Sequence, residues 1–191
     1  MPEQGQTRED VWTAMAEHFL DTETRQRLPY TAWVCVEAGL TREAAHAVWC
    51  REVIPVVGTN LLSVAGEWAG WERRWVIERA RRCQGRRWVW PYPGVRRIAS
   101  PCWNTIAGCM ERLSQTPDPA VRLQQQEALS ALAEHLVDFL PKPLNEASVP
   151  VREATRRLGL EEAWALLCPC LLREERTVGR ERLERAFAQL G

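Results

Sequence analysis

The chain has 191 residues, a formal net charge of zero, 46% hydrophobic residues and 26% charged residues. This balance is typical of a folded globular protein and excludes a chain that is disordered throughout. A chain of this length can bury a hydrophobic core without disulfide bonds or a structural metal. No apolar run approaches the roughly 20 residues that cross a bilayer, and residues 1–10 lack the apolar stretch of a secretory signal.

The cysteines favour a reducing compartment. There are seven of them, an odd number, and Cys35, Cys50 and Cys109 lie within helical apolar patterns, where a free thiol behaves as a small hydrophobic group. We therefore expect unpaired thiols and a cytoplasmic protein.

Apolar residues recur at helical spacing through the first 84 residues. The string Thr7-Arg8-Glu9-Asp10 resembles a capping box and predicts that a helix begins there. A second helix is expected to begin near Leu28 and to end at Gly39. A third is expected to begin at Thr41 and to be interrupted by Pro55. A short segment after Asn60 and a helix over 72–82 complete this part.

Residues 85–103 have a different character. Three prolines at positions 91, 93 and 101 predict that no continuous helix runs through this stretch. The alternation of Trp88, Trp90 and Tyr92 is typical of one short strand or an extended arm. We expect an irregular Arg/Trp/Pro-rich connector here.

Helical spacing resumes in the last part of the chain. Helices are expected over 104–113, 120–140, 151–158, 160–172 and 178–190, with Pro169 ending the regular part of the fourth. The predicted fold class is all-α, with eight or nine helices. They form an N-terminal helical module (1–84) and a C-terminal helical module (104–191), which pack together across the connector (85–103).

Two strings resemble the signatures of an uncharacterised bacterial family. Residues 19–23 read Phe-Leu-Asp-Thr-Glu, and residues 60–71 read Asn-Leu-Leu-Ser-Val-Ala-Gly-Glu-Trp-Ala-Gly-Trp. The resemblance covers about residues 8–84. It implies a bacterial source and a helical domain of unknown function, and it implies no chemistry.

No metal or cofactor site is expected. Cys168 and Cys170 form the only close cysteine pair, whereas zinc sites usually combine two such pairs or a pair with matching histidines. Gly66 and Gly70 lack the Gly-Lys-Ser/Thr pattern that binds nucleotide phosphates.

Two enzymatic alternatives stay open. Asp21, Glu23 and Glu67 can act as acid and base if they converge, although helix capping explains the first two equally well. A thiol can also meet an imidazole in space, for instance Cys50 or Cys35 with His18 or His46.

The zero net charge hides a positive band. Residues 71–97 contain nine arginines and two glutamates, a local charge of +7, while residues 1–70 carry −5 and residues 98–191 carry −2. Aromatic residues are interleaved with the arginines. Three interpretations compete: a solvated helix face paired with acids of this chain, a protein-binding surface, or arginines that neutralise nucleic-acid phosphates while aromatics stack on bases.

The second interpretation gives the predicted function. Exposed Arg and Trp are enriched in protein interfaces, so we expect a non-enzymatic protein that binds another bacterial protein, most concretely an immunity or antitoxin-type protein that blocks a toxin domain. A nucleic-acid-associated regulator is the alternative, and an enzyme using the three carboxylates comes third. The predicted partner-binding residues are Arg73, Arg81, Arg86, Arg87, Trp88, Trp90, Tyr92, Arg96 and Arg97.

Overall fold

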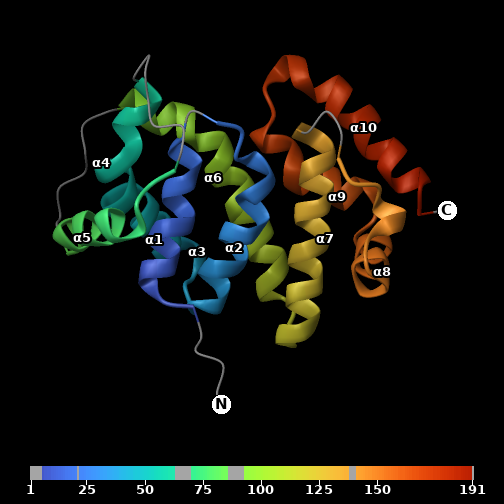
Figure 1. Cartoon of the computed structure of the whole chain (residues 1–191), viewed down its shortest axis with the longest axis horizontal. Helices are drawn as coiled ribbons and strands as arrows, with labels where there is room; N and C mark the ends of the chain where they lie inside the picture. Colours follow the sequence, from blue (N-terminus) through green and yellow to red (C-terminus); the bar gives the residue numbers. More distant parts are fainter. Residues whose placement is uncertain (1–5, 21, 63–69, 86–92, 138–140, 191) are drawn as a thin grey trace. The chain divides into compact units, whose positions relative to one another are not determined.

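The computed structural model describes residues 6–20, 22–62, 70–85, 93–137 and 141–190. Helices are the only regular structure in these ranges, which confirms the all-α prediction (Figure 1). Within the same ranges, none of the helices is long and apolar enough to span a membrane.

The chain divides into two compact units. The first contains Met1–Thr24 and Val34–Trp103, and the second contains Arg25–Trp33 and Asn104–Gly191. The boundary between them falls inside helix α2 (Leu28–Glu37) and inside helix α6 (Pro93–Ser114). The three-part division expected from the sequence stays a prediction.

The remaining helices of the first unit are short. They are α1 (Arg8–Ala16), a 3-10 turn (Glu17–Phe19), α3 (Arg42–Val48), a π-helical turn (Trp49–Val53), α4 (Ile54–Val57), a second 3-10 turn (Gly58–Leu62) and α5 (Arg73–Cys83). Helix α5 packs beside α1 (Figure 1).

The expected helix ends are confirmed for α1, α2 and α3. The Thr7 side chain accepts a hydrogen bond from the backbone N–H of Asp10, and Asp10 bonds back to the Thr7 backbone, which completes the capping box. Thr41 caps α3 through the N–H of Ala44. Gly39 follows α2 with φ of 70°, a left-handed conformation that glycine adopts without strain.

Pro55 interrupts the α-helical pattern in an unexpected way. The chain stays helical through it, but a π turn precedes it, in which the N–H of Ile54 bonds to the carbonyl of Trp49. The wider turn changes the hydrogen-bond register just before the residue that has no N–H to donate.

Helix α6 begins earlier than the sequence predicts. We expected helix from about residue 104, but α6 starts at Pro93 and continues through Pro101. Proline is tolerated at Pro93 because the first turn of a helix has no internal partner for its N–H groups. The carbonyl that loses its partner at Pro101 belongs to Arg97, an exposed residue that water can reach. Part of the expected irregular connector is therefore helical.

A buried carboxylate holds the first unit together. Glu52, on the π turn, is only 6% exposed and accepts hydrogen bonds from α1. The indole Nε1 of Trp12 donates to it at 2.6 Å, and Arg8 donates through Nε at 3.0 Å and Nη2 at 2.5 Å. Because a buried charge is costly unless it is paired and hydrogen-bonded, these contacts fix α1 against the π turn.

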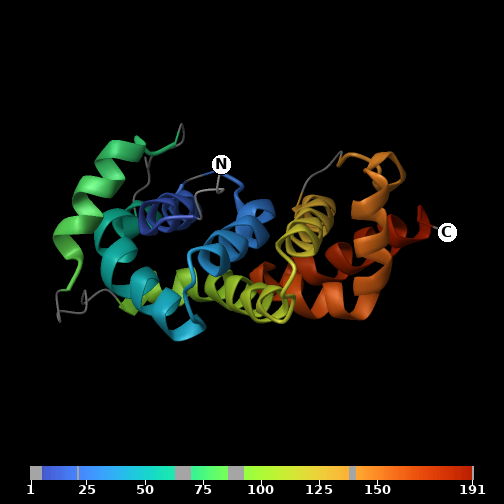
Figure 2. The same ribbon diagram turned by 90° about the horizontal axis from the view of Figure 1, so that it is seen from below.

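The second unit is built on α7 (Pro119–Val137). Around it are α8 (Val149–Leu158), α9 (Leu160–Leu167) and α10 (Arg176–Ala188), with 3-10 turns at Arg25–Arg27, Leu144–Glu146, Cys168–Cys170 and Arg173–Glu175. Helices α8 and α10 pack against α7 (Figure 2). The turn that contains Pro169 ends the regular part of α9, as the sequence predicts.

An N-terminal segment completes the second unit. The 3-10 turn Arg25–Arg27 packs against α7. The guanidinium of Arg25 donates to the carboxylate of Glu175 at 2.5 and 3.1 Å. This two-point contact joins residues that are far apart in sequence, and its hydrogen bonds lower the pKa of Glu175 below its ordinary value of 4.5.

Truncation of the buried carboxylate should destabilise the protein. We expect Glu52→Ala to lower the free energy of unfolding by about 3 kcal/mol, because it leaves the Trp12 indole without an acceptor. Glu52→Gln should cost less, since it keeps an acceptor for that indole. Urea denaturation followed by circular dichroism measures both changes.

The matched control is Glu78→Ala. Glu78 forms an exposed i,i+4 pair with Arg74, so its removal should change the free energy of unfolding by no more than about 0.5 kcal/mol. Equal losses for Glu52→Ala and Glu78→Ala would contradict the role given to Glu52.

Stability should fall in acid partly through Glu175. A carboxyl whose pKa is lower in the folded state stabilises the protein above its unfolded pKa of 4.5, and this contribution is lost as the pH falls through the folded value. The stability difference between wild type and Glu175→Gln should therefore shrink as the pH drops below 4.5. Glu174→Gln, a neighbouring exposed position, should show no such convergence in urea titrations at several pH values.

Candidate protein-binding surface

Four of the nine predicted partner-binding residues lie within the described part of the chain. Arg73 and Arg81 lie on α5, and Arg96 and Arg97 lie on α6. The other five fall outside the described residues. They are Arg86, Arg87, Trp88, Trp90 and Tyr92.

The arginines of α5 are partly neutralised by acids on α1. Arg73 Nη2 lies 3.0 Å from Asp10 Oδ1, and Arg81 forms an ion pair with Glu9. Burial acts to raise the pKa of Asp10, but hydrogen bonds from Thr7 and Arg73 outweigh it and hold that pKa below its ordinary value. Arg73 and Arg81 therefore contribute to the packing of α5 on α1.

An aromatic stack lies at the start of α5. The rings of Trp71 and Trp75 are stacked with centroids 5.5 Å apart, and the guanidinium of Arg79 lies 4.6 Å from the Trp75 ring centroid. The indole of Trp71 also donates to the carbonyl of Ala16 at 2.8 Å. These rings are half-buried, so this part of the positive band supports the fold through cation–π and stacking contacts.

The arginines of α6 have different surroundings. Arg96 and Arg97 are exposed, and no carboxylate pairs with either of them among the described residues. Ile98 beside them is 51% exposed. Arg51, exposed on the π turn, and Arg96 both act electrostatically on Cys50, so the two cations lie near one thiol. We call Arg51, Arg96, Arg97 and Ile98 the α6 cationic face.

A thiol–imidazole contact lies beside this face. Cys50 Sγ is 3.3 Å from His46 Nε2, one helical turn away. The sequence left this pairing open among several, and the structure selects it. The ring of His46 also packs on Trp103, with centroids 4.8 Å apart.

The acid–base set stays a prediction. Glu23 is exposed, and Asp21 and Glu67 lie outside the described residues. Within those same ranges, no three His, Cys, Asp or Glu side chains are arranged to hold a metal ion.

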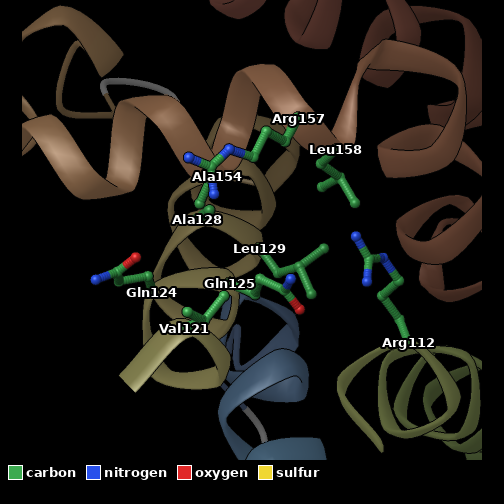
Figure 3. A pocket seen from close by; sticks show the side chains of 9 residues that line it. All are labelled: Arg112, Val121, Gln124, Gln125, Ala128, Leu129, Ala154, Arg157 and Leu158. Carbon is green, nitrogen blue, oxygen red and sulfur yellow. The ribbon is translucent and has the colours of Figure 1, made fainter. Parts of the chain in front are cut away.

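The second unit contains a small cavity between α7 and α8 (Figure 3). Its lining includes the apolar side chains of Val121, Leu129 and Leu158 together with Arg112 and Arg157 (Figure 3). The cavity volume is about 50 Å³, far below the roughly 300–1,000 Å³ typical of sites for small molecules. Arg112 is moreover paired with Glu162 at 2.6 Å. This cavity suits the end of one aliphatic side chain rather than a substrate.

Comparison with known proteins identifies one family. A family model described as a domain of unknown function, DUF7079, matches residues 6–114. The match reaches beyond residue 84, where we expected the family resemblance to end, and so includes all of α6. No curated protein and no solved structure matches the chain.

Two buried thiols should be chemically inert. Burial raises the pKa of both Cys35 and Cys109 to about 12. Since the thiolate is the reactive form, iodoacetamide at about pH 8 should leave both unmodified in the native protein and modify both in urea. Peptide mass spectrometry measures the labelling of each thiol. Labelling in the native protein at the rate of a small free thiol would contradict the prediction, and would show that the first unit (for Cys35) or the second unit (for Cys109) opens readily.

Proposed function

We propose that this chain, which belongs to the DUF7079 family, is a non-enzymatic cytoplasmic protein that binds another bacterial protein. The most concrete form of this proposal is an immunity or antitoxin-type protein that blocks a toxin domain. Of the three carboxylates in the enzymatic alternative, Glu23 alone lies in the described part of the chain, and a binding role requires none of them.

The observation that supports the proposal is the contrast between the two groups of arginines. Arg73 and Arg81 already bind acids of this chain, so a partner would have to displace those contacts. Arg96 and Arg97 are exposed beside Ile98, with no pairing carboxylate in the described ranges. Exposed arginines match the composition of protein interfaces, where this residue is enriched.

The partner's surface should be acidic. Three guanidinium groups on the α6 cationic face attract carboxylates at long range and can bind them in two-point contacts at short range.

Reversal of the charges on α6 tests the proposal. The double substitution Arg96→Glu and Arg97→Glu should weaken the complex by at least about tenfold, because like charges would face each other across the contact. The measurement begins with affinity capture from the native host and identification of the retained protein. The affinity of the purified pair is then measured for wild type and variant, and growth is followed when the captured protein is expressed with and without this chain.

The control reverses two arginines elsewhere. Arg176 and Arg185 are exposed on α10, so their substitution by Glu changes the net charge equally but leaves the α6 cationic face intact. Loss of binding in both double variants would indicate a general charge effect. Unchanged binding in the α6 variant would overturn the assignment of this surface.

A nucleic-acid-associated regulator remains the second candidate, because the same exposed arginines can neutralise phosphates. That binding would fall steeply and log-linearly with salt. Retention of DNA or RNA on filters at low salt, lost in the α6 variant but kept in the α10 variant, would favour it over the protein partner.

A further inference from the structure

We propose that Cys50 and His46 form a reactive thiol–imidazole pair, and that this pair makes Cys50 a site of covalent modification by soft carbon electrophiles of the α,β-unsaturated carbonyl class. This inference does not depend on the proposed function. It rests on the placement of the two side chains and of the charges around them.

The geometry brings the thiol to its base. Cys50 Sγ and His46 Nε2 are 3.3 Å apart, within hydrogen-bonding distance for sulfur. Packing of the His46 ring on Trp103, at 4.8 Å between centroids, limits the orientations that the imidazole can adopt. Cys50 belongs to the π turn, and single π turns inside helices occur frequently at functional sites.

Among the described residues, the charges that shift the pKa values of this pair are positive. Arg42 on α3 acts on His46, Arg51 on the π turn acts on Cys50, and Arg96 on α6 acts on both. Positive charge stabilises a thiolate and disfavours a protonated imidazole. The cations therefore favour negative charge on sulfur and oppose the imidazolium, so the base assistance rests on the 3.3 Å contact between Sγ and Nε2.

The resting protonation states suit a base-assisted attack. Burial raises the pKa of Cys50, while Arg96 and Arg51 act in the opposite direction, so the thiol carries its proton at neutral pH. Burial lowers the pKa of His46, and Arg96 and Arg42 lower it further, so the imidazole is neutral. A neutral thiol thus faces a neutral base that can take its proton.

The reaction balances without any further reagent. As Sγ attacks the β-carbon of the electrophile, the thiol proton passes to His46 Nε2 and a carbon–sulfur bond forms. The electron pair of the carbon–carbon double bond moves to the α-carbon and carbonyl. The α-carbon then takes a proton from the imidazolium, which returns His46 to its neutral form and leaves a thioether on Cys50.

Cys168 provides an internal comparison. Its thiol is also half-buried, and among the described residues no histidine is bonded to it. A simple thiol reacts through the small fraction of thiolate present in solution, so its rate rises about tenfold per pH unit until the pH approaches its pKa. A thiol paired with an imidazole reacts at a rate that levels off once the imidazole is neutral.

The experiment uses the full chain and N-ethylmaleimide, an electrophile of the stated class. The rate of modification at each cysteine is followed by peptide mass spectrometry between about pH 5 and pH 9, a range that spans the titration of His and the onset of thiol ionisation. We expect the Cys50 rate to form a plateau near neutral pH. It should exceed the Cys168 rate by about tenfold at about pH 6.5.

Two variants separate base assistance from simple exposure. His46→Gln should lower the Cys50 rate by about tenfold and remove the plateau, while the Cys168 rate stays unchanged. Arg96→Gln should keep the plateau and move its onset to higher pH, because Arg96 lowers the pKa of His46. Circular dichroism establishes that each variant is folded, and the unchanged Cys168 rate is an independent check.

Either of two results would overturn the proposal. One is a Cys50 rate that rises with pH in parallel with that of Cys168. The other is a folded His46→Gln variant in which Cys50 reacts as fast as in the wild type.

Discussion

Removing the Glu52 carboxylate from water costs hydration free energy, and α1 offsets that cost with hydrogen bonds from Trp12 and Arg8. The contact connects the first described helix to a π turn, and its partners Trp12 and Glu52 are 40 residues apart in the sequence. Since loss of the contact would leave the buried Glu52 carboxylate and the Trp12 indole without each other, the contact helps to specify how α1 lies in the first unit.

One consequence concerns the arginines. With α1 fixed, Glu9 and Asp10 lie where they pair with Arg81 and Arg73 on α5. The arginines at the start of α6 pair with no carboxylate in the described ranges and stay exposed. A band with a strong positive excess in sequence is thus divided into a part that stabilises the fold and a part that can meet a partner.

A second consequence concerns the π turn itself. Its five residues, Trp49–Val53, have side chains that differ in burial. Glu52 and Val53 are buried, Arg51 is exposed, and Cys50 lies between these extremes beside His46. A regular α-helix would shift the register of these side chains relative to α3. The same irregular turn therefore anchors the core and places a thiol, an imidazole and a cation together near the surface.

The sequence alone determined the helical class, the capping box at Thr7, the cap at Thr41 and the glycine after α2, because these features depend on neighbours within one or two turns. It missed the start of α6, because proline disfavours a helix when only local sequence is considered. Pro93 lies in the first turn, where its N–H would have no partner in the helix, and water can reach the carbonyl that Pro101 leaves without a donor. The sequence identified a positive band and a set of thiols and imidazoles that are able to pair. Only the tertiary structure decided which arginines meet acids of α1 and which thiol meets an imidazole. Long-range contacts such as that of Trp12 with Glu52 cannot be predicted from the spacing of residues within one helix, because they depend on how separate helices pack.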